Sequence, residues 1–201
     1  MWLDRHAAIQ TKVNSLYWDE KDGFYYDRWN ATGELCKVPT AASYWPLLAE
    51  MASKEQSGRM LSRINDDRKF GGVMPMPSLS RDDPDFHADG TYWRGSMWMP
   101  TAYMAMKAAD AYGDYGTART AARKIVEMMY RTYADFEPHT IWECYSPTEA
   151  KPSTYAKNSC YVRDNFCGWS ALGPISLFIE DVIGVKQANA FENTLTCDFE
   201  K

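Results

Sequence analysis

Residues 98–132, WMPTAYMAMKAADAYGDYGTARTAARKIVEMMYRT, carry the same pattern of small and apolar side chains twice. The first copy comprises Trp98, Thr101, Ala102, Ala105, Ala108, Ala109 and Tyr112, and the second comprises Ala118, Ala121, Ala122, Ile125, Met128, Met129 and Thr132. Each copy has the three-to-four-residue spacing that places side chains on one face of a helix. The region of Gly113 and Gly116 joins the two copies. The stretch therefore predicts an antiparallel pair of helices whose small residues permit close packing.

Helical spacing continues upstream of this pair. Residues 2–16 place five side chains on one helical face, namely Trp2, His6, Ile9, Val13 and Leu16. In the stretch TAASYWPLLAEMAS, Pro46 is compatible with a short helix only if it lies in the first turn. Ser53 and Gln56 then form a capping box for the next helix. Three helices are therefore expected before the pair.

Downstream of the pair, one more helix is expected from about residue 170 to residue 183, ending at Gly184. Its inward face is predicted to consist of Leu172, Ile175, Ile179 and Val182. Strands are expected only in short hairpins near residues 23–38, where Asp22-Gly23 and alternating aromatic residues indicate a turn between extended segments. Residues 186–201 form a weakly patterned tail.

Two long segments lack helical spacing. Residues 70–90 are rich in Gly, Pro and Asp, and residues 135–168 contain three prolines. Loops of this length within a compact domain are usually functional. An alternation of helices and long loops, with the loops on one rim, is typical of helical toroids and barrels. The alternative is a four-helix bundle with long connecting loops.

Length and composition exclude several classes of protein. The chain has 201 residues, enough for one large domain or two small ones. A net charge of −5 and the absence of a Lys/Arg run argue against nucleic-acid binding. No apolar run reaches the length of a membrane span, and the charges near the N-terminus are unlike a signal peptide. The sequon Asn30-Ala31-Thr32 is therefore interpreted as a turn.

The cysteines indicate neither a disulfide framework nor a metal centre. There are five of them, Cys36, Cys144, Cys160, Cys167 and Cys197, with no CxxC pair. Reduced thiols are the simplest interpretation, and they favour a cytoplasmic location without establishing one. The three histidines are scattered, so we expect no metal site. Phosphate-loop, dinucleotide and GxSxG motifs are absent, and no cofactor is expected.

The stretch GTYWRGSMWMP, residues 90–100, sets one arginine among aromatic side chains. Aromatic residues make up 14% of the chain, which fits a binding site for flat ligands such as sugars but fits an aromatic helical core equally well. In the second loop, Glu143 lies between aromatic neighbours in IWECYSP. Such a carboxyl group is suited to acid or base chemistry on a sugar. It can also be an ordinary loop residue or an ion-pair partner of Arg94.

Glycoside hydrolysis usually requires a second carboxyl group across the bond that is cleaved. The first loop offers Asp82, Asp83, Asp85 and Asp89. The sequence DDPD is also typical of a solvated turn, which is the reading that we favour for these residues.

Several stretches together resemble one enzyme family. They are YWRGSMW, IWECYSP and FCGWSALGPISLFIEDVIG, with support from YWDEKDGFYYD, YWPLLAEMAS and FGGVMPMPSLSRDDPDF. In order and spacing they resemble the C-terminal half of the catalytic domain of trehalase-like glycosidases, and most of all glycoside hydrolase family 63 and its bacterial relatives. The resemblance covers residues 1–185 and leaves residues 186–201 as a tail.

The resemblance implies an all-α fold, namely about six of the twelve helices of an (α/α)6 toroid with long rim loops. It implies an inverting, exo-acting hydrolase of the α-glucosidase or trehalase type, acting on a disaccharide or oligosaccharide. Glu143 matches the family's general base, although Cys144 stands where the family usually has Asn. The family's acid is an aspartate near a GWD motif, which is expected upstream of residue 1. The chain is therefore expected to be a fragment.

The same resemblance assigns substrate-binding roles to residues around a sugar funnel. Trp93 is expected to stack on a pyranose ring, and Arg94 to bind hydroxyl groups or orient Glu143. Trp98 is expected in the funnel or in the core. The remaining expected binding residues are Tyr145, Phe166 and Trp169, the last two on the opposite wall.

Two alternatives remain at this stage. The first is a helical half-toroid that binds sugar without hydrolysis or associates with itself, either as a homo-oligomer or with the missing N-terminal half. The second is a different enzyme on a helical toroid, such as an epimerase or a polysaccharide lyase. A lyase would need a Tyr/His pair, and His139 is the only histidine near Glu143 in sequence.

Overall fold

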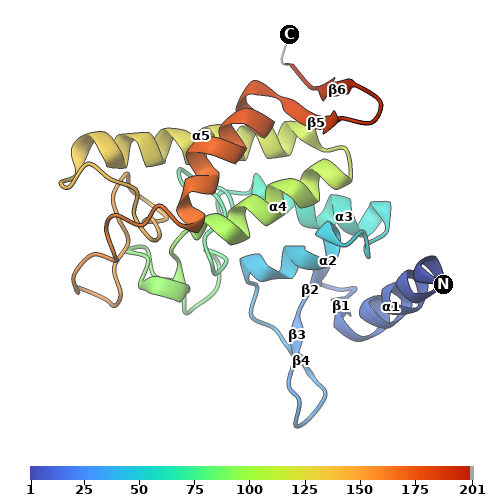
Figure 1. Cartoon of the computed structure of the whole chain (residues 1–201). Helices are drawn as coiled ribbons and strands as arrows, with labels where there is room; N and C mark the ends of the chain where they lie inside the picture. Colours follow the sequence, from blue (N-terminus) through green and yellow to red (C-terminus); the bar gives the residue numbers. More distant parts are fainter. Residues whose placement is uncertain (200–201) are drawn as a thin grey trace.

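The computed structural model describes residues 1–199 and is mainly helical (Figure 1). The α-helices are α1 (Trp2–Tyr17), α2 (Trp45–Leu48), α3 (Lys54–Leu61), α4 (Met99–Ala111) and α5 (Tyr115–Asp135), and a π-helix spans Gly173–Ile183. Short 3-10 helices span Ala41–Tyr44, Ser62–Ile64, Tyr92–Arg94 and Trp169–Leu172. In this part of the chain, no helix is long and apolar enough to cross a membrane.

The predicted pair of helices is confirmed as α4 and α5, which run side by side and bury their alanine faces (Figure 1). Gly113 has φ 73°, which suits the tight turn between them. The side chain of Asp114 then accepts a hydrogen bond from the backbone N of Thr117 at 3.2 Å and caps α5. The π-helix packs on both, and Gly173 permits this contact because a Cβ there would lie 2.5 Å from the sulfur of Met129.

The last helix exists, but its inward face differs from the prediction. Ile175 and Ile179 are exposed, while Gly173, Leu177 and Asp181 are buried. A π-helix forms i→i+5 hydrogen bonds and therefore has a wider turn than an α-helix. Leu172 and Val182 are partly buried against the core as predicted, whereas the spacing expected for an α-helix wrongly placed Ile175 and Ile179 there.

The strands form three separate antiparallel hairpins. They pair β1 (Trp18–Asp19) with β2 (Phe24–Tyr25), β3 (Asp27–Arg28) with β4 (Leu35–Cys36), and β5 (Val185–Asn189) with β6 (Thr194–Cys197). The third hairpin corrects the expectation that strands occur only near residues 23–38. Its turn forms because the side chain of Asn189 accepts backbone hydrogen bonds from Phe191 and Glu192, and Asn193 adopts φ 51°. The last two tail residues, 200–201, lie outside the described residues.

The N-terminal helices follow the local sequence signals. Pro46 lies in the first turn of α2, and the capping box of α3 is present, with Ser53 and Gln56 exchanging hydrogen bonds of 3.1 and 2.8 Å. Helix α1 is different because none of its residues is buried, and Trp2 on its apolar face is 72% exposed. This helix lies at the edge of the molecule (Figure 1).

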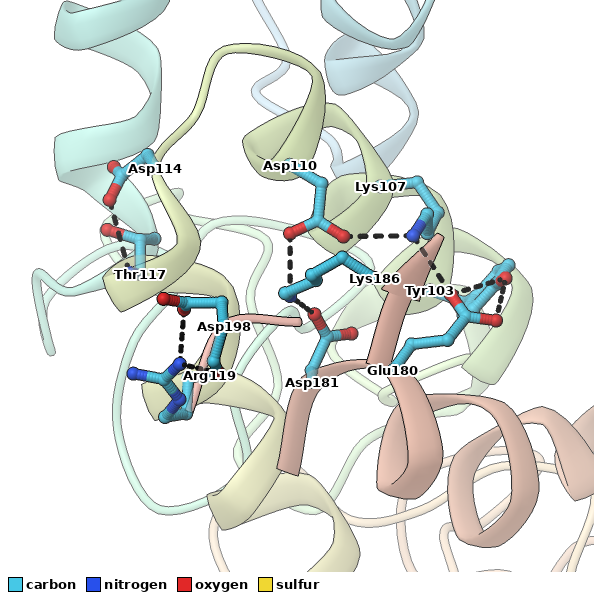
Figure 2. A network of polar contacts seen from close by, with 10 residues as sticks. All are labelled: Tyr103, Lys107, Asp110, Asp114, Thr117, Arg119, Glu180, Asp181, Lys186 and Asp198. Atoms are coloured by element: carbon cyan, nitrogen blue, oxygen red, sulfur yellow. Dashed lines mark hydrogen bonds and ion pairs between the residues drawn. The ribbon is translucent and has the colours of Figure 1, made fainter. Parts of the chain in front are cut away.

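A buried ion network joins α4 to the π-helix and to β5 (Figure 2). Lys186 contacts Asp181, and its ammonium nitrogen lies 2.8 Å from a carboxylate oxygen of Asp110. Lys107 lies 2.9 Å from both Asp110 and Glu180. Burial raises the pKa of Asp181, and the second oxygen of this carboxyl group has no hydrogen-bond partner. Lys186 is therefore the main cation that compensates a fully buried carboxyl group.

The two long loops meet beside the start of α4. Antiparallel bridges connect Pro77 to Met97, Met97 to Tyr145, and Tyr145 to Pro152. The backbone N of Met97 donates to the carbonyl of Tyr145 at 2.9 Å, and the reverse bond measures 3.1 Å. These bonds place the segment around Glu143 next to the aromatic segment around Trp93.

Candidate active site

The backbone of Glu143 is fixed on both sides. Its N–H donates to the carbonyl of Arg163 at 2.9 Å, and its carbonyl accepts a hydrogen bond from the hydroxyl of Ser170 at 3.0 Å. Ser170 belongs to the 3-10 turn before the π-helix. The carboxyl group is thus carried by a loop that is tied to two other segments.

Glu143 is 9% exposed, and two tyrosines contact its carboxyl group. Tyr92 donates to Oε1 at 3.1 Å, and Tyr155 donates to Oε2 at 3.4 Å. Burial and the hydrogen bond to Glu143 raise the pKa of Tyr92 to about 12, and burial and the nearby charge also raise the pKa of Tyr155. Both phenols therefore remain protonated donors at neutral pH.

An aromatic cluster borders the carboxyl group. Trp93 stacks on Trp98 with ring centroids 4.1 Å apart and planes inclined by 3°. Trp98 is 3% exposed and supports the inner face of the Trp93 ring. Trp93 is 54% exposed, so the other face of its ring is open to solvent. The ring centroid of Trp169 lies 6.3 Å from that of Trp98 and 4.9 Å from that of Phe166. The structure thus brings four of the six predicted binding residues together, and their roles toward a ligand stay predictions.

The other two predicted binding residues have different surroundings. Arg94 forms its ion pair with Asp85, at 3.8 Å, whereas hydrogen bonds from tyrosines reach the Glu143 carboxylate. Tyr145 is 1% exposed, and its hydroxyl accepts a hydrogen bond from the backbone N of Trp142 at 3.1 Å. Its buried position fits support of the loop better than contact with a sugar.

Cys144, next to Glu143, is buried in a cluster of hydroxyl groups. The hydroxyls of Ser96 and Ser153 lie 2.5 Å apart, and both interact with the Cys144 side chain. Burial raises the pKa of the Cys144 thiol to about 12, so this side chain is not a nucleophile at neutral pH. Across residues 1–199, no group of three or more His, Cys, Asp or Glu side chains is arranged to hold a metal ion.

The four aspartates of the first loop all have local partners. Asp82 binds Lys69 and Ser80, each at 2.6 Å, and Asp85 pairs with Arg94. The remaining two serve as turn acceptors: Asp83 accepts the backbone N–H of residue 85 and Asp89 accepts the hydroxyl of residue 91. These interactions fit the interpretation of the four aspartates as turn residues.

The pair of Lys69 and Asp82 gives a testable pH dependence. Burial opposes ionisation of Asp82, but hydrogen bonds from Lys69 and Ser80 outweigh it and lower the pKa of this carboxyl group. A lowered folded-state pKa stabilises the protein above the ordinary pKa near 4, and this contribution disappears as the pH falls through the folded-state value.

We expect Lys69→Met to lower the free energy of unfolding at pH 7 by no more than about 1 kcal/mol, because the pair is partly exposed. Urea unfolding at pH 7 and at pH 2.5 measures this difference, which should be smaller at the lower pH. A difference of equal size at pH 2.5 would show that Lys69 stabilises the loop by packing instead.

Sequence reasoning missed the residues that contact the carboxyl group of Glu143. Tyr92 lies in the motif that contains Trp93, so the sequence offered a reason to place Tyr92 in the site. It offered no such reason for Tyr155, which lies twelve residues beyond Glu143 in an irregular loop. Contacts of this kind arise from the way the two loops cross.

The family model for the mannosylglycerate hydrolase MGH1-like glycoside hydrolase domain matches residues 1–163. An uncharacterized protein of Borreliella burgdorferi is 30% identical over 184 residues, which are 90% of this chain and 39% of that protein. The mannosylglycerate hydrolase of Thermus thermophilus is 32% identical over 108 residues, 53% of this chain and 24% of that enzyme. The chain thus spans well under half the length of these relatives.

Solved structures show the same fold. The glycoside hydrolase family 63 mannosylglycerate hydrolase of Thermus thermophilus, crystallised with Tris, aligns with a TM-score of 0.67 at 23% identity, covering 85% of this chain and 36% of that one. Neutral trehalase Nth1 of Saccharomyces cerevisiae aligns with a TM-score of 0.68 at 20% identity, covering 89% and 30%. The predicted partial (α/α)6 toroid is confirmed. The chain belongs to the MGH1-like glycoside hydrolase domain family, whose members include glycoside-hydrolysing enzymes.

Proposed function

We propose that this chain carries the general base and one wall of the sugar site of an inverting, exo-acting α-glycosidase. The observation that carries the proposal is a buried carboxyl group, Glu143, that accepts two phenolic hydrogen bonds beside the open face of Trp93. A carboxylate is the form of this group that accepts a proton from water. The stacked pair of Trp93 and Trp98 supplies a flat apolar surface for a pyranose ring.

In the proposed reaction, a water molecule near Glu143 attacks the anomeric carbon as the carboxylate removes its proton. A second carboxyl group, roughly 6.5–9.5 Å from the first, protonates the leaving oxygen. By the family resemblance the acid is an aspartate near a GWD motif, which these 201 residues lack, so we assign the acid to a segment outside them. The proposal therefore includes pairing with a complementary part of the toroid.

The proposed substrate is a small α-linked saccharide with a terminal hexose. Support comes from relatives named mannosylglycerate hydrolase and trehalase. Hydrolysis of p-nitrophenyl α-glucoside, p-nitrophenyl α-mannoside, trehalose and mannosylglycerate tests the class. Proton NMR of the sugar released first from the p-nitrophenyl α-glycosides tests the stereochemistry, and an inverting enzyme releases it as the β-anomer. Initial release of the α-anomer from these two substrates would overturn the inverting mechanism.

We expect Trp93→Ala to weaken sugar binding by about threefold to tenfold, the effect of losing one stacking surface. Isothermal titration calorimetry with glucose and mannose measures the affinity. Trp29→Ala is the matched control, because Trp29 is also exposed but belongs to the turn of the β3–β4 hairpin. Equal losses in both variants would indicate that Trp93 does not contact the sugar.

Sugar binding without hydrolysis is the second candidate function. It is favoured by the engagement of Asp82, Asp83, Asp85 and Asp89 within their own loop. In this case calorimetry detects sugar binding, whereas the four glycosides remain intact. Light scattering on the same samples tests the self-association that the exposed apolar face of α1 would allow.

A further inference from the structure

We propose that Tyr92, assisted by Tyr155, is a positioning residue that holds the Glu143 carboxylate in the orientation in which it removes a proton from the attacking water. The inference rests on the proposed function of Glu143 and assigns the orientation of this group to two phenols. One phenol donates to each carboxylate oxygen, at 3.1 and 3.4 Å. A carboxylate held at both oxygens has little freedom to rotate about its terminal bond.

The backbone at Tyr92 is in a conformation that this residue type rarely adopts. Thr91 has φ 40° and Tyr92 has φ 57°, and both follow Gly90 at φ 98°. Side chains other than glycine, asparagine and aspartate are uncommon in this left-handed region. Strained residues of this kind persist where their surroundings hold them, and they cluster at functional sites.

The surroundings of Tyr92 do hold it in several ways. Its N–H donates to the carbonyl of Thr154 at 2.8 Å, and its carbonyl accepts bonds from the N–H of Ser96 and the indole of Trp98, both at 3.2 Å. Its ring packs edge-on against Trp98, with ring centroids 4.7 Å apart, and its centroid lies 5.3 Å from that of Tyr155. The hydroxyl is therefore aimed at Glu143 by a framework that joins residues 92–98 to the second long loop.

The charge distribution supports the same assignment. Arg94, the cation predicted to orient Glu143, forms its ion pair with Asp85, whereas two phenols donate to the carboxylate. The bond that the Tyr92 N–H donates to the Thr154 carbonyl also links the two tyrosines, because Thr154 directly precedes Tyr155. Movement of the second loop at Thr154 would thus misalign both donors at once.

The test uses Tyr92→Phe, which removes the hydroxyl and keeps the ring. In any preparation that hydrolyses an α-glycoside, we expect kcat to fall about tenfold to hundredfold, as for the loss of a hydrogen bond to a charged group, with KM changed less than threefold. Tyr155→Phe should lower kcat by a smaller factor, since its bond is longer. Tyr103→Phe is the control, because Tyr103 donates to Glu180 in the distant ion network.

A second measurement does not depend on turnover. In the 201-residue chain labelled with carbon-13 at glutamate Cδ, the Glu143 signal is the one absent from Glu143→Gln. At pH 7, Tyr92→Phe should shift and broaden this signal, while Tyr103→Phe should leave it unchanged. If thermal unfolding shows that Tyr92→Phe does not fold, the Glu143 signal is measured in Tyr155→Phe instead, and the same shift is expected.

The outcomes separate the two claims. An unchanged Glu143 signal, or an unchanged kcat in an active preparation, overturns the positioning role of Tyr92. A shifted signal combined with no turnover in any preparation counts against the proposed hydrolysis and leaves the contact to Glu143 established.

Discussion

Replacing Glu143 by glutamine is expected to reduce kcat by about two to four orders of magnitude, the usual contribution of a general base. Glutamine keeps the shape of the side chain and its backbone contacts to Arg163 and Ser170 but cannot accept a proton from water. Steady-state kinetics on p-nitrophenyl α-glycosides, in any preparation with measurable turnover, provide the measurement.

Circular dichroism and thermal unfolding of Glu143→Gln serve as the structural control and should match the unsubstituted chain. Glu149→Gln is the control substitution, since Glu149 lies in the same loop but pairs with Lys151 at the surface. An active preparation that tolerates Glu143→Gln would show that another residue is the base.

Replacing Lys186 by methionine is expected to lower the free energy of unfolding by about 3–5 kcal/mol, because the substitution leaves a buried carboxyl group without its cation. Lys186 is 4% exposed, and its partner Asp181 is fully buried (Figure 2). Urea unfolding at pH 7 measures the loss. Arg131→Met is the control, since its pair with Glu127 is exposed and should contribute little.

The loss caused by Lys186→Met should depend on pH. Burial already raises the pKa of Asp181, and without Lys186 the folded-state pKa rises further. The folded chain then binds more protons than the unfolded chain above pH 4, so the stability of the variant falls as the pH rises. We therefore expect a smaller loss near pH 4 than at pH 7. The double variant Lys186→Met/Asp181→Asn should recover part of it, and no recovery would point to packing of the lysine stem.

Much of the fold follows from local sequence patterns. The repeated small residues of 98–132 predicted α4 and α5, and the capping box of Ser53 and Gln56 predicted the start of α3. These signals act within one or two helical turns, so they survive without knowledge of the rest of the chain. In the last helix, Leu172 and Val182 were predicted correctly, but Ile175 and Ile179 were not, because the wider turn of the π-helix carries Leu177 inward instead.

Part of the candidate site was likewise predictable from the sequence, and part was not. The motif around Trp93 and the loop around Glu143 were evident from their composition. The phenolic partners of the carboxylate were not, because the bond from Tyr92 joins residues fifty-one positions apart and depends on the bridge between Met97 and Tyr145.

The sequence by itself thus determined the helical class, the candidate base and the aromatic surface beside it, since residue type and short-range spacing carry that information. Only the tertiary structure decided which groups meet. It directs Arg94 to Asp85, aims Tyr92 and Tyr155 at Glu143, and buries Asp181 against Lys186. The physical reason is that hydrogen bonds and buried ion pairs form between segments that packing brings together, and local propensity does not encode that packing.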